Sequence, residues 1–382
     1  MTLREKIVQE IREHGPIRFS RYMEMCLYDP ELGYYSRNAE QFGKAGDFYT
    51  SSDVHAVFGR LMARQFEEMW RVLGSPAQID IVELGPGRGL FAQDVLDWSE
   101  KKFPEFFRVL RYSLVERSPA LRERLETTLA RHWGKGTTSV VPDSAAFERA
   151  LAPGGPVIVF ANEFFDALPV EVLSAQRELL VAEKDGRFVE TWGSASPEEV
   201  EYLDRYGVHP EAGERVEVPI VAQHEMSNAA ASIASGLLIA IDYGYTRAEQ
   251  LAGRHRSTVT AYRQHSVSAN PYEAPGEQDI SAHANFTALA AAAEQQGMQV
   301  HPLLTQSQFL MGIGERNQFA DAFEGCRSPQ EQAKVALQLK HLVTPAGMGE
   351  TFHVLVGSKG VGLDCVAGLA GLSFGRRGPR AY

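Results

Sequence analysis

The stretch Ile79-Asp-Ile-Val-Glu-Leu-Gly-Pro-Gly-Arg-Gly-Leu-Phe91 decides which fold we expect for this chain. A β-branched run ends in an acidic residue, a tight glycine turn follows, and an amphipathic stretch begins at Leu90. This order predicts a strand, a loop and a helix, in which bare backbone at Gly85, Gly87 and Gly89 lies against a nucleotide. A plain turn between strand and helix explains the same residues, so further signals are needed.

The spacing of the glycines separates two classes of cofactor. It is G-x-G-x-G rather than the G-x-G-x-x-G of dinucleotide sites, and Pro86 removes a backbone N–H that a pyrophosphate would use. Glu83 adds a carboxylate where a cationic amino or sulfonium group could sit. Glu116 ends the next apolar run, 109–116, where ribose hydroxyls bind in related folds. Together these residues favour S-adenosylmethionine over NAD.

Composition limits the class of protein. The chain has 382 residues, enough for a large core and a second lobe, and 44% apolar and 23% charged residues are typical of globular proteins. The net charge of −11 argues against nucleic acid as a partner. Three cysteines without metal-ligand spacing predict a reducing compartment and no metal site.

The N-terminal residues and the longest apolar runs are the places where targeting signals would lie. The first residues predict an amphipathic helix with acidic side chains, without the apolar region of a signal peptide or the acid-poor character of a transit peptide. No apolar run approaches the roughly 20 residues that span a bilayer. We therefore expect a cytoplasmic protein without membrane insertion.

The order of the elements predicts a doubly wound, mostly parallel α/β sheet. Strand and helix patterns alternate from 79 to about 165, break off where Lys184-Asp-Gly186 predicts a hairpin, and resume at 236–244. The expected strands are 79–84, 109–116, 138–141, 156–161, 236–244, 298–304 and 351–357, and the expected helices include 89–101, 119–131 and 285–297. The expected regions are an N-terminal helical region with a cofactor-flanking loop at 1–75, a cofactor-binding domain at 76–168 and 236–358, an inserted smaller lobe at 170–235 and a flexible tail at 359–382.

Polar residues directly follow the buried run 157–161. Because ligands lie beyond the carboxyl ends of parallel strands, Asn162, Glu163 and Asp166 would face the glycine loop. They could orient an amine or guanidine nucleophile and help remove its proton. Capping of a following helix explains the same residue types equally well.

Three other segments have two interpretations each. Gly46-Asp-Phe-Tyr-Thr-Ser-Ser-Asp53 is either a capped helix start or a loop over the cofactor. Asp242, at another strand tip, either contacts the substrate or belongs to a turn. The polar stretch 246–283 is a candidate lid or substrate loop. Within it, His283 is a candidate base, although a solvated loop histidine is the simpler interpretation.

Five ordered motifs extend the argument to most of the chain, about 5–357. They are Leu32-Gly-Tyr-Tyr35, Gly46-Asp-Phe-Tyr-Thr-Ser51, Val82-Glu-Leu-Gly-Pro-Gly-Arg-Gly89, Asn162-Glu-Phe-Phe-Asp-Ala-Leu-Pro169 and Asp242-Tyr-Gly244. With them the chain resembles the MidA-like methyltransferases, the family of the mitochondrial complex I assembly arginine methyltransferase. The resemblance implies a class I methyltransferase (Rossmann-like) fold and S-adenosylmethionine as cofactor.

The same resemblance places Gly85, Gly87 and Glu116 in the cofactor motifs of that family and the Gly46-Asp47 loop at the border of its pocket. The candidate catalytic residues are Asn162, Glu163 and Asp166, with no metal. The candidate cofactor-binding residues are Gly46, Asp47, Thr50, Glu83, Gly85, Pro86, Gly87 and Glu116.

The leading hypothesis is a methyltransferase that acts on a protein, at an arginine guanidine, with a respiratory-complex subunit as one candidate substrate. A small-molecule methyltransferase and a non-catalytic assembly factor that keeps the fold are the alternatives. An NAD-dependent dehydrogenase disagrees with the glycine spacing and with Pro86. The sequence leaves the oligomeric state undetermined.

Overall fold

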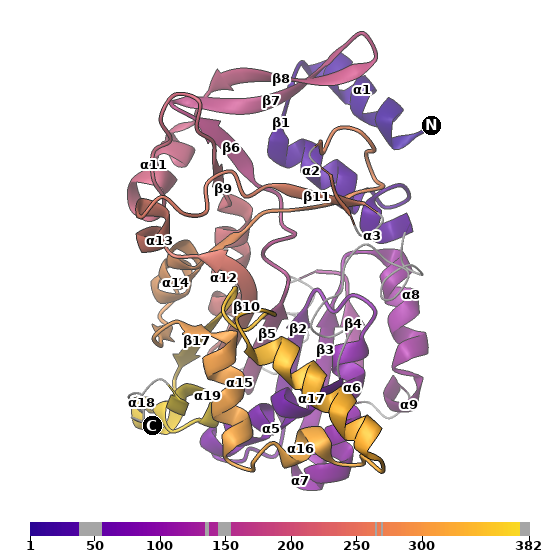
Figure 1. Cartoon of the computed structure of the whole chain (residues 1–382), viewed down its shortest axis with the longest axis vertical. Helices are drawn as coiled ribbons and strands as arrows, with labels where there is room; N and C mark the ends of the chain where they lie inside the picture. The colour runs from indigo at the N-terminus through magenta and orange to yellow at the C-terminus, as the bar shows by residue number, and fades with distance from the viewer. Residues whose placement is uncertain (38–55, 134–136, 144–153, 264–265, 269, 375–382) are drawn as a thin grey trace.

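The computed structural model describes residues 1–37, 56–133, 137–143, 154–263, 266–268 and 270–374 (Figure 1). Its centre is a nine-stranded sheet with the order β15-β17-β10-β5-β2-β3-β4, in which β14 also pairs with β10 and β16 with β17. Strands β10, β5, β2, β3 and β4 run parallel, and β17 is antiparallel to β10. The strands are β2 (Ile79–Leu84), β3 (Leu110–Val115), β4 (Thr138–Val141), β5 (Pro156–Asn162), β10 (Ser235–Tyr245), β14 (Ala284–Asn285), β15 (Gln299–Val300), β16 (Leu304–Thr305) and β17 (Phe352–Lys359).

Helices cover both faces of this sheet, which confirms the predicted doubly wound fold. Every residue of β2 is buried, so the strand is a continuous apolar run broken by two acids rather than an alternating pattern. Helices α5 (Ala56–Val72), α6 (Leu90–Lys102) and α15 (Gln306–Glu315) pack on one face, and α12 (Ile220–Ser232) and α14 (Phe286–Gln295) on the other. The segment 46–53, which the sequence predicts either to cap the start of α5 or to cover the cofactor, lies outside the described residues.

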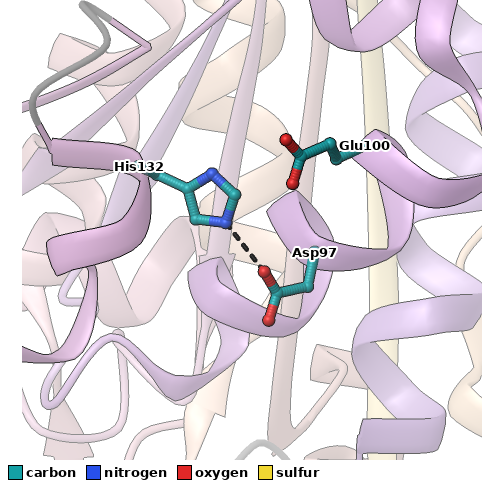
Figure 2. Close-up of side chains that lie close together, drawn as sticks. All are labelled: Asp97, Glu100 and His132. Carbon is teal, nitrogen blue, oxygen red and sulfur yellow. Dashed lines mark hydrogen bonds and ion pairs between the residues drawn. The ribbon is translucent and has the colours of Figure 1, made fainter.

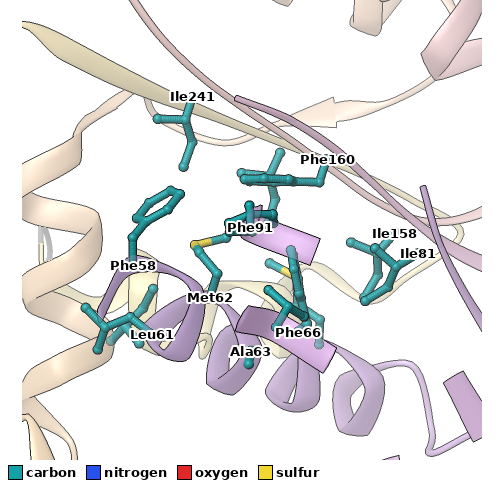
Figure 3. Close-up of a cluster of buried hydrophobic side chains, with 14 of the residues drawn as sticks. Phe58, Leu61, Met62, Ala63, Phe66, Ile81, Phe91, Ile158, Phe160 and Ile241 are labelled. Carbon is teal, nitrogen blue, oxygen red and sulfur yellow. The ribbon is translucent and has the colours of Figure 1, made fainter. Parts of the chain in front are cut away.

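An aromatic cluster joins α5 and α6 to the sheet (Figure 3). Phe91, in the first turn of α6, stacks on Phe160 of β5 with 4.6 Å between ring centroids, and Phe66 of α5 meets both rings edge-on. Burying such large side chains contributes roughly 1.5–3 kcal/mol each. The helix that follows the glycine loop is therefore anchored directly beneath the loop.

A second, smaller antiparallel sheet lies in the upper part of the molecule (Figure 1). β7 and β8 form a hairpin whose turn residues, Asp185 and Gly186, have φ of 52° and 76°, as the tight hairpin turns require. The strands are β1 (Ile17–Arg18), β6 (Glu171–Ser174), β7 (Arg177–Lys184), β8 (Arg187–Ser194) and β9 (Val216–Val218). Because β1 pairs with β7, the N-terminal region and the segment after residue 170 share one sheet.

The stretch 246–283, expected to be a polar loop, contains a three-stranded sheet ordered β12-β11-β13. Buried Ala261 and Ile280 pack it against the N-terminal helices α1 and α2. The elements are α1 (Leu3–His14), α2 (Phe19–Tyr28), α3 (Tyr34–Arg37), α13 (Arg247–Leu251), β11 (Thr260–Arg263), β12 (Ser266–Ser268) and β13 (Asp279–Ser281). We call these elements, together with the antiparallel sheet of β1, β6, β7, β8 and β9, the upper layer. The domain boundaries drawn from the sequence stay a prediction.

Two other segments differ from expectation. The strand predicted at 298–304 is split into β15 and β16, because Pro302 has no N–H for the ladder. The segment 359–374, predicted as part of a flexible tail, forms two short helices, and Val366 and Leu369 are buried in the main core. This segment is held there by apolar burial and by Gly371 N–H, which donates to the side-chain oxygen of Gln65 over 2.8 Å.

The remaining helices connect these layers. They are α7 (Pro104–Val109), α8 (Pro119–Thr128), α9 (Ala130–Trp133), α11 (Pro197–Tyr206), α16 (Ala320–Phe323), α17 (Pro329–Val343), α18 (Leu363–Ala367) and α19 (Ala370–Ser373). In the part of the chain that the structure describes, no helix combines the length and the apolar character needed to cross a bilayer.

Candidate active site

A cavity of about 420 Å³ lies at the carboxyl edge of the parallel strands. Its walls come from the glycine loop after β2, the end of β3 and the turn after β5, and from α12 and the upper layer. This is the position at which doubly wound sheets bind ligands. Of the candidate residues, the structure brings together Glu83, Gly85, Pro86, Gly87, Glu116, Asn162, Glu163 and Asp166.

The glycine loop needs its glycines for two different reasons. Gly85, Gly87 and Gly89 have φ of 63°, 52° and 76°, a region that side chains with a Cβ rarely adopt. A Cβ on Gly85 would lie 2.8 Å from the ring of Phe164, whereas one on Gly87 would meet nothing within 4 Å. Gly85 thus permits a close internal approach, and Gly87 presents open backbone to the cavity.

Glu116 is a buried acid in the cavity wall just after β3. Its Oε1 accepts a hydrogen bond from Ser118 N–H at 2.8 Å, which fixes the carboxyl group. Burial raises the pKa of Glu116 to about 7, and the backbone N–H groups around it oppose that rise. The group is therefore poised to accept hydrogen bonds from ligand hydroxyls near neutral pH.

The protonation of Glu83 differs from the charged carboxylate that the sequence predicts. It is 5% exposed, its Oε2 accepts a hydrogen bond from Tyr112 Oη–H at 2.9 Å, and burial raises its pKa to about 8. Because Glu83 is still part of buried β2, water does not solvate its charge. The carboxyl group is thus mostly protonated at neutral pH unless a bound cation lowers its pKa.

The turn after β5 carries the candidate catalytic residues. Residues 163–168 form a turn and not a helix, so helix capping does not explain Asn162, Glu163 and Asp166. Glu163 has φ of 50°, its N–H donates to the carbonyl of Ile241 at 2.9 Å, and Asn162 Nδ2 donates to its Oε1 at 3.2 Å. A residue with a Cβ kept in this conformation costs about 1–3 kcal/mol, and such strain clusters at functional sites.

Asp166 is 8% exposed, and its two oxygens differ. Oδ2 accepts a hydrogen bond from Tyr243 Oη–H at 2.5 Å, whereas Oδ1 is buried and has no hydrogen-bond partner among the described residues. Burial raises the pKa of Asp166 to about 6, against the hydrogen bond from Tyr243. A buried carboxylate oxygen is costly without a donor, so this cavity is suited to a ligand that brings an N–H or O–H.

Neither interpretation describes Asp242, which lies within β10 and is not among the described residues that line the cavity. It is fully buried, and its Oδ2 accepts from the N–H groups of Phe164, Phe165 and Asp166 at 3.2, 2.9 and 3.3 Å. Burial and the neighbouring acids raise the pKa of Asp242, and these N–H groups oppose the rise. The Asp242 carboxylate thereby holds the turn after β5 against β10.

Sequence reasoning missed the wall formed by the upper layer and α12. Tyr35 Oη–H donates to Asp279 Oδ1 at 3.0 Å, Tyr28 Oη–H donates to the carbonyl of Ala167 at 2.9 Å, and all three side chains line the cavity. Tyr35 belongs to the motif Leu32-Gly-Tyr-Tyr35, and this motif was the sequence signal that could have pointed to this wall. On α12, polar residues at 225, 228 and 232 face the cavity at helical spacing.

The remaining candidates are Gly46, Asp47, Thr50 and His283. Gly46, Asp47 and Thr50 fall outside the described residues. His283 does not line the cavity in the described part of the chain; its Nδ1 lies 3.0 Å from Nδ1 of His255. Burial and the nearby His255 lower the pKa of His283 to about 4, which makes it a weak base at neutral pH.

Two clusters among the described residues have the geometry of a metal site. Figure 2 shows the first, in which His132 Nε2 lies 2.8 Å from Asp97 Oδ1 beside Glu100. Arg131 already pairs with both carboxylates, at 2.8 and 2.6 Å. Arg18 likewise contacts all three acids of the second cluster, which are Glu171, Glu178 and Glu199. An arginine thus supplies the cation that each cluster needs.

Comparison with known proteins gives this cavity a context. Residues 61–304 match the model of a family described as putative S-adenosyl-L-methionine-dependent methyltransferases. The chain is 31% identical to the protein arginine methyltransferase NDUFAF7 homolog, mitochondrial, of Drosophila melanogaster, over 94% of this chain and 85% of that one. It is 28% identical to the human protein arginine methyltransferase NDUFAF7, mitochondrial, over 91% of this chain and 81% of the relative.

Solved structures agree with the sequence relatives. A Burkholderia thailandensis protein bound to S-adenosyl-homocysteine superposes with a TM-score of 0.82 and 28% identity, over 96% of this chain and 94% of that one. A native structure from the same organism gives a TM-score of 0.80 with 26% identity, over 99% and 95% of the two chains. The predicted class I methyltransferase fold and its cofactor are confirmed.

The expected cytoplasmic location is corrected by the same comparison, because the curated relatives from fly, rat and human are all named mitochondrial proteins. The N-terminal pattern on which that expectation depended is a weak guide to location. The agreement between the cavity at the strand ends, the matched family model and the superposed structure supports one conclusion. The chain belongs to this family of S-adenosyl-L-methionine-dependent methyltransferases, and its cofactor is S-adenosylmethionine.

Proposed function

We propose that this methyltransferase transfers a methyl group to an arginine guanidine of a protein substrate. The observation that carries the proposal is the buried Oδ1 of Asp166, a carboxylate oxygen in the cavity wall without a hydrogen-bond donor among the described residues. A guanidinium offers five N–H donors in a planar fork that matches carboxylates. The names of the relatives, protein arginine methyltransferases, support the same acceptor.

The charge of the cavity supports a cationic acceptor. Among the described residues, seven acidic side chains line it beside Arg88 and Arg117, and burial keeps one of the seven, Glu83, mostly protonated. The acids are Glu83, Glu116, Asp143, Glu163, Asp166, Glu225 and Asp279. An excess of acids in a partly enclosed site raises the local concentration of a cationic side chain and disfavours anionic acceptors.

The residues of the two walls have separate roles in this proposal. Glu116, Glu83, Pro86, Gly85 and the open backbone at Gly87 hold the cofactor, with Gly46, Asp47 and Thr50 as candidates from the segment outside the described residues. S-adenosylmethionine supplies an electrophilic methyl group on sulfur. Asn162, Glu163 and Asp166 hold the guanidine in line with that methyl group, so that positioning supplies much of the rate.

The proton balance gives the carboxylates a second task. As the guanidine nitrogen bonds to the methyl carbon, the carbon–sulfur bond breaks, S-adenosyl-homocysteine leaves, and the nitrogen gives up one proton. Asp166, with its pKa of about 6, is ionised at neutral pH and stabilises the cationic nitrogen before it receives or passes on that proton. A respiratory-complex subunit stays one candidate substrate, on the family resemblance given by the five motifs.

The test is methyl transfer from radiolabelled S-adenosylmethionine to the proteins of a mitochondrial extract, followed by acid hydrolysis and amino-acid chromatography. We expect the label in methylated arginine and its loss with Asp166→Asn, while S-adenosyl-homocysteine still binds in calorimetry. Label only in small molecules would show a small-molecule methyltransferase. Cofactor binding without any transfer would favour a non-catalytic assembly factor.

A further inference from the structure

We propose that Tyr243 is a positioning residue of this active site, which acts through Asp166 by fixing the direction and the ionisation of its carboxylate. The inference rests on the proposed function, in which Asp166 receives the N–H groups of the acceptor. Tyr243 itself was singled out only as the middle residue of the Asp242-Tyr-Gly244 motif. The structure gives that motif a physical task.

Two adjacent residues of β10 hold the same turn by different means. Asp242 binds the backbone of the turn through three N–H groups, and Tyr243 binds its side chain through the hydroxyl on Asp166 Oδ2. Ile241, opposite Asn162, is the last residue of β10 that pairs with β5, and Asp242 and Tyr243 follow it, paired with His353 and Phe352 of β17. The turn is therefore fixed to β10 of the central sheet through both its backbone and a side chain.

The Tyr243 hydroxyl makes the two carboxylate oxygens of Asp166 inequivalent. Oδ2 is occupied by Tyr243, and Oδ1, which is buried beside the cavity that Asp166 lines, has no hydrogen-bond partner among the described residues. A carboxyl group held through one oxygen loses its rotation, so its second oxygen is already aimed when the acceptor arrives. Such preorganisation lowers the cost of forming the reactive geometry.

The ring of Tyr243 is itself held in place. It meets Phe352 edge-on at 5.5 Å and His283 edge-on at 5.2 Å between ring centroids. Phe352 is the first residue of β17, and His283 lies two residues after β13. The hydroxyl is thus fixed by packing, and its position does not depend on the bound acceptor.

The groups around Asp166 explain why one hydrogen bond matters. Acids and phenols from four elements and the turn act on its surroundings: Asp242 and Tyr243 of β10, Glu163 of the turn, Tyr28 of α2, Tyr35 of α3 and Tyr262 of β11. Burial and nearby acids disfavour the ionised form of a carboxyl group, and a donated hydrogen bond favours it. Deleting the hydroxyl should therefore raise the pKa of Asp166.

The experiment compares Tyr243→Phe with Tyr245→Phe in the full chain. The control removes the same hydroxyl two residues further along β10, from a buried tyrosine stacked on His255. The carboxyl carbon of Asp166 is titrated by NMR after selective 13C-aspartate labelling and is assigned with Asp166→Asn. We expect Tyr243→Phe to shift this titration upward by about one pH unit and Tyr245→Phe to leave it unchanged.

Turnover provides the second readout. With Tyr243→Phe, the acid limb of the pH–rate profile should move upward by the same amount, and kcat below neutral pH should fall about tenfold while S-adenosyl-homocysteine binds as before. An unmoved titration with an unmoved acid limb would overturn the role of Tyr243. The NMR signal needs no turnover, so failure of the wild-type chain to methylate protein would refute the proposed function alone.

Discussion

The two walls of the cavity are built in different ways. The cofactor wall comes from one local unit, β2, the glycine loop and β3, in which the conformation of three glycines and one acid decides the shape. The proposed acceptor wall combines Asp166, which Tyr243 holds, with Tyr35 and Asp279, and these residues are distant in the sequence. Shape dominates the first wall and charge the second. A local unit can be recognised from the sequence, whereas a convergent wall is formed only by folding.

The largest difference between the walls should appear with Glu163→Gln. This variant keeps the size of the side chain and removes its charge next to the proposed acceptor position. We expect turnover to fall at least about 100-fold, because it loses electrostatic stabilisation of the transferring group, with the affinity for S-adenosyl-homocysteine within about twofold. Initial rates and calorimetry on the same preparation measure both. Normal turnover would remove Glu163 from the proposed mechanism.

The opposite pattern should follow from Glu116→Ala. Loss of a carboxylate that accepts hydroxyl hydrogen bonds should weaken S-adenosyl-homocysteine binding about 10- to 100-fold, since such bonds contribute roughly 1.5–3 kcal/mol. Calorimetric titration gives the dissociation constant directly. Glu123→Ala, on the exposed side of α8, is the matched control. Equal affinities for the two variants would separate Glu116 from the cofactor.

The wild-type cofactor wall should also respond to pH. Burial raises the pKa of Glu116 to about 7, and only its ionised form accepts two hydroxyl groups. The affinity for S-adenosyl-homocysteine should therefore be full above pH 7 and fall as the pH drops through 7, by up to about tenfold per unit. Calorimetry from pH 6 to 8.5 tests this. Glu116→Gln should bind more weakly, and a pH dependence that survives this change would assign the effect to another group.

The smallest effect on the cavity should come from a change in the hairpin. Gly186 has φ of 76°, and a Cβ there would meet nothing within 4 Å, so Gly186→Ala introduces backbone strain without a clash. We expect a loss of about 1 kcal/mol in the free energy of unfolding. Denaturant titration measures it, while turnover and cofactor affinity should stay within about twofold. A large loss of activity would show that the hairpin takes part in acceptor binding.

Single residues show where sequence reasoning succeeded. Gly85, Gly87 and Glu116 were recognisable because a strand, a turn and the next strand tip are local patterns with a fixed spacing. The same argument placed Asn162, Glu163 and Asp166 at this edge of the sheet, and the turn conformation excluded helix capping; their catalytic role stays a prediction. Asp279 and the α12 residues had no comparable signal, because their approach to the cavity depends on how the upper layer packs.

The corrections have physical causes of the same kind. Pro302 interrupts a strand that hydrophobicity predicts as continuous, and the polar stretch 246–283 gains a small sheet because Ala261 and Ile280 are buried against the N-terminal helices. Residues 359–374 appear mobile from their composition, yet Leu369 completes the main core. In each case the deciding contact is with residues far away in the chain.

By itself, the sequence determined the parallel sheet, the position of the glycine loop and the class of cofactor, because buried strands and tight turns restrict which residues they accept. The tertiary structure alone decided that burial raises the pKa of Glu83 to about 8, that Asp242 fastens a turn, and that one oxygen of Asp166 has no hydrogen-bond partner among the described residues. Charge states and open hydrogen-bonding groups depend on burial, and burial is a property of the whole folded chain.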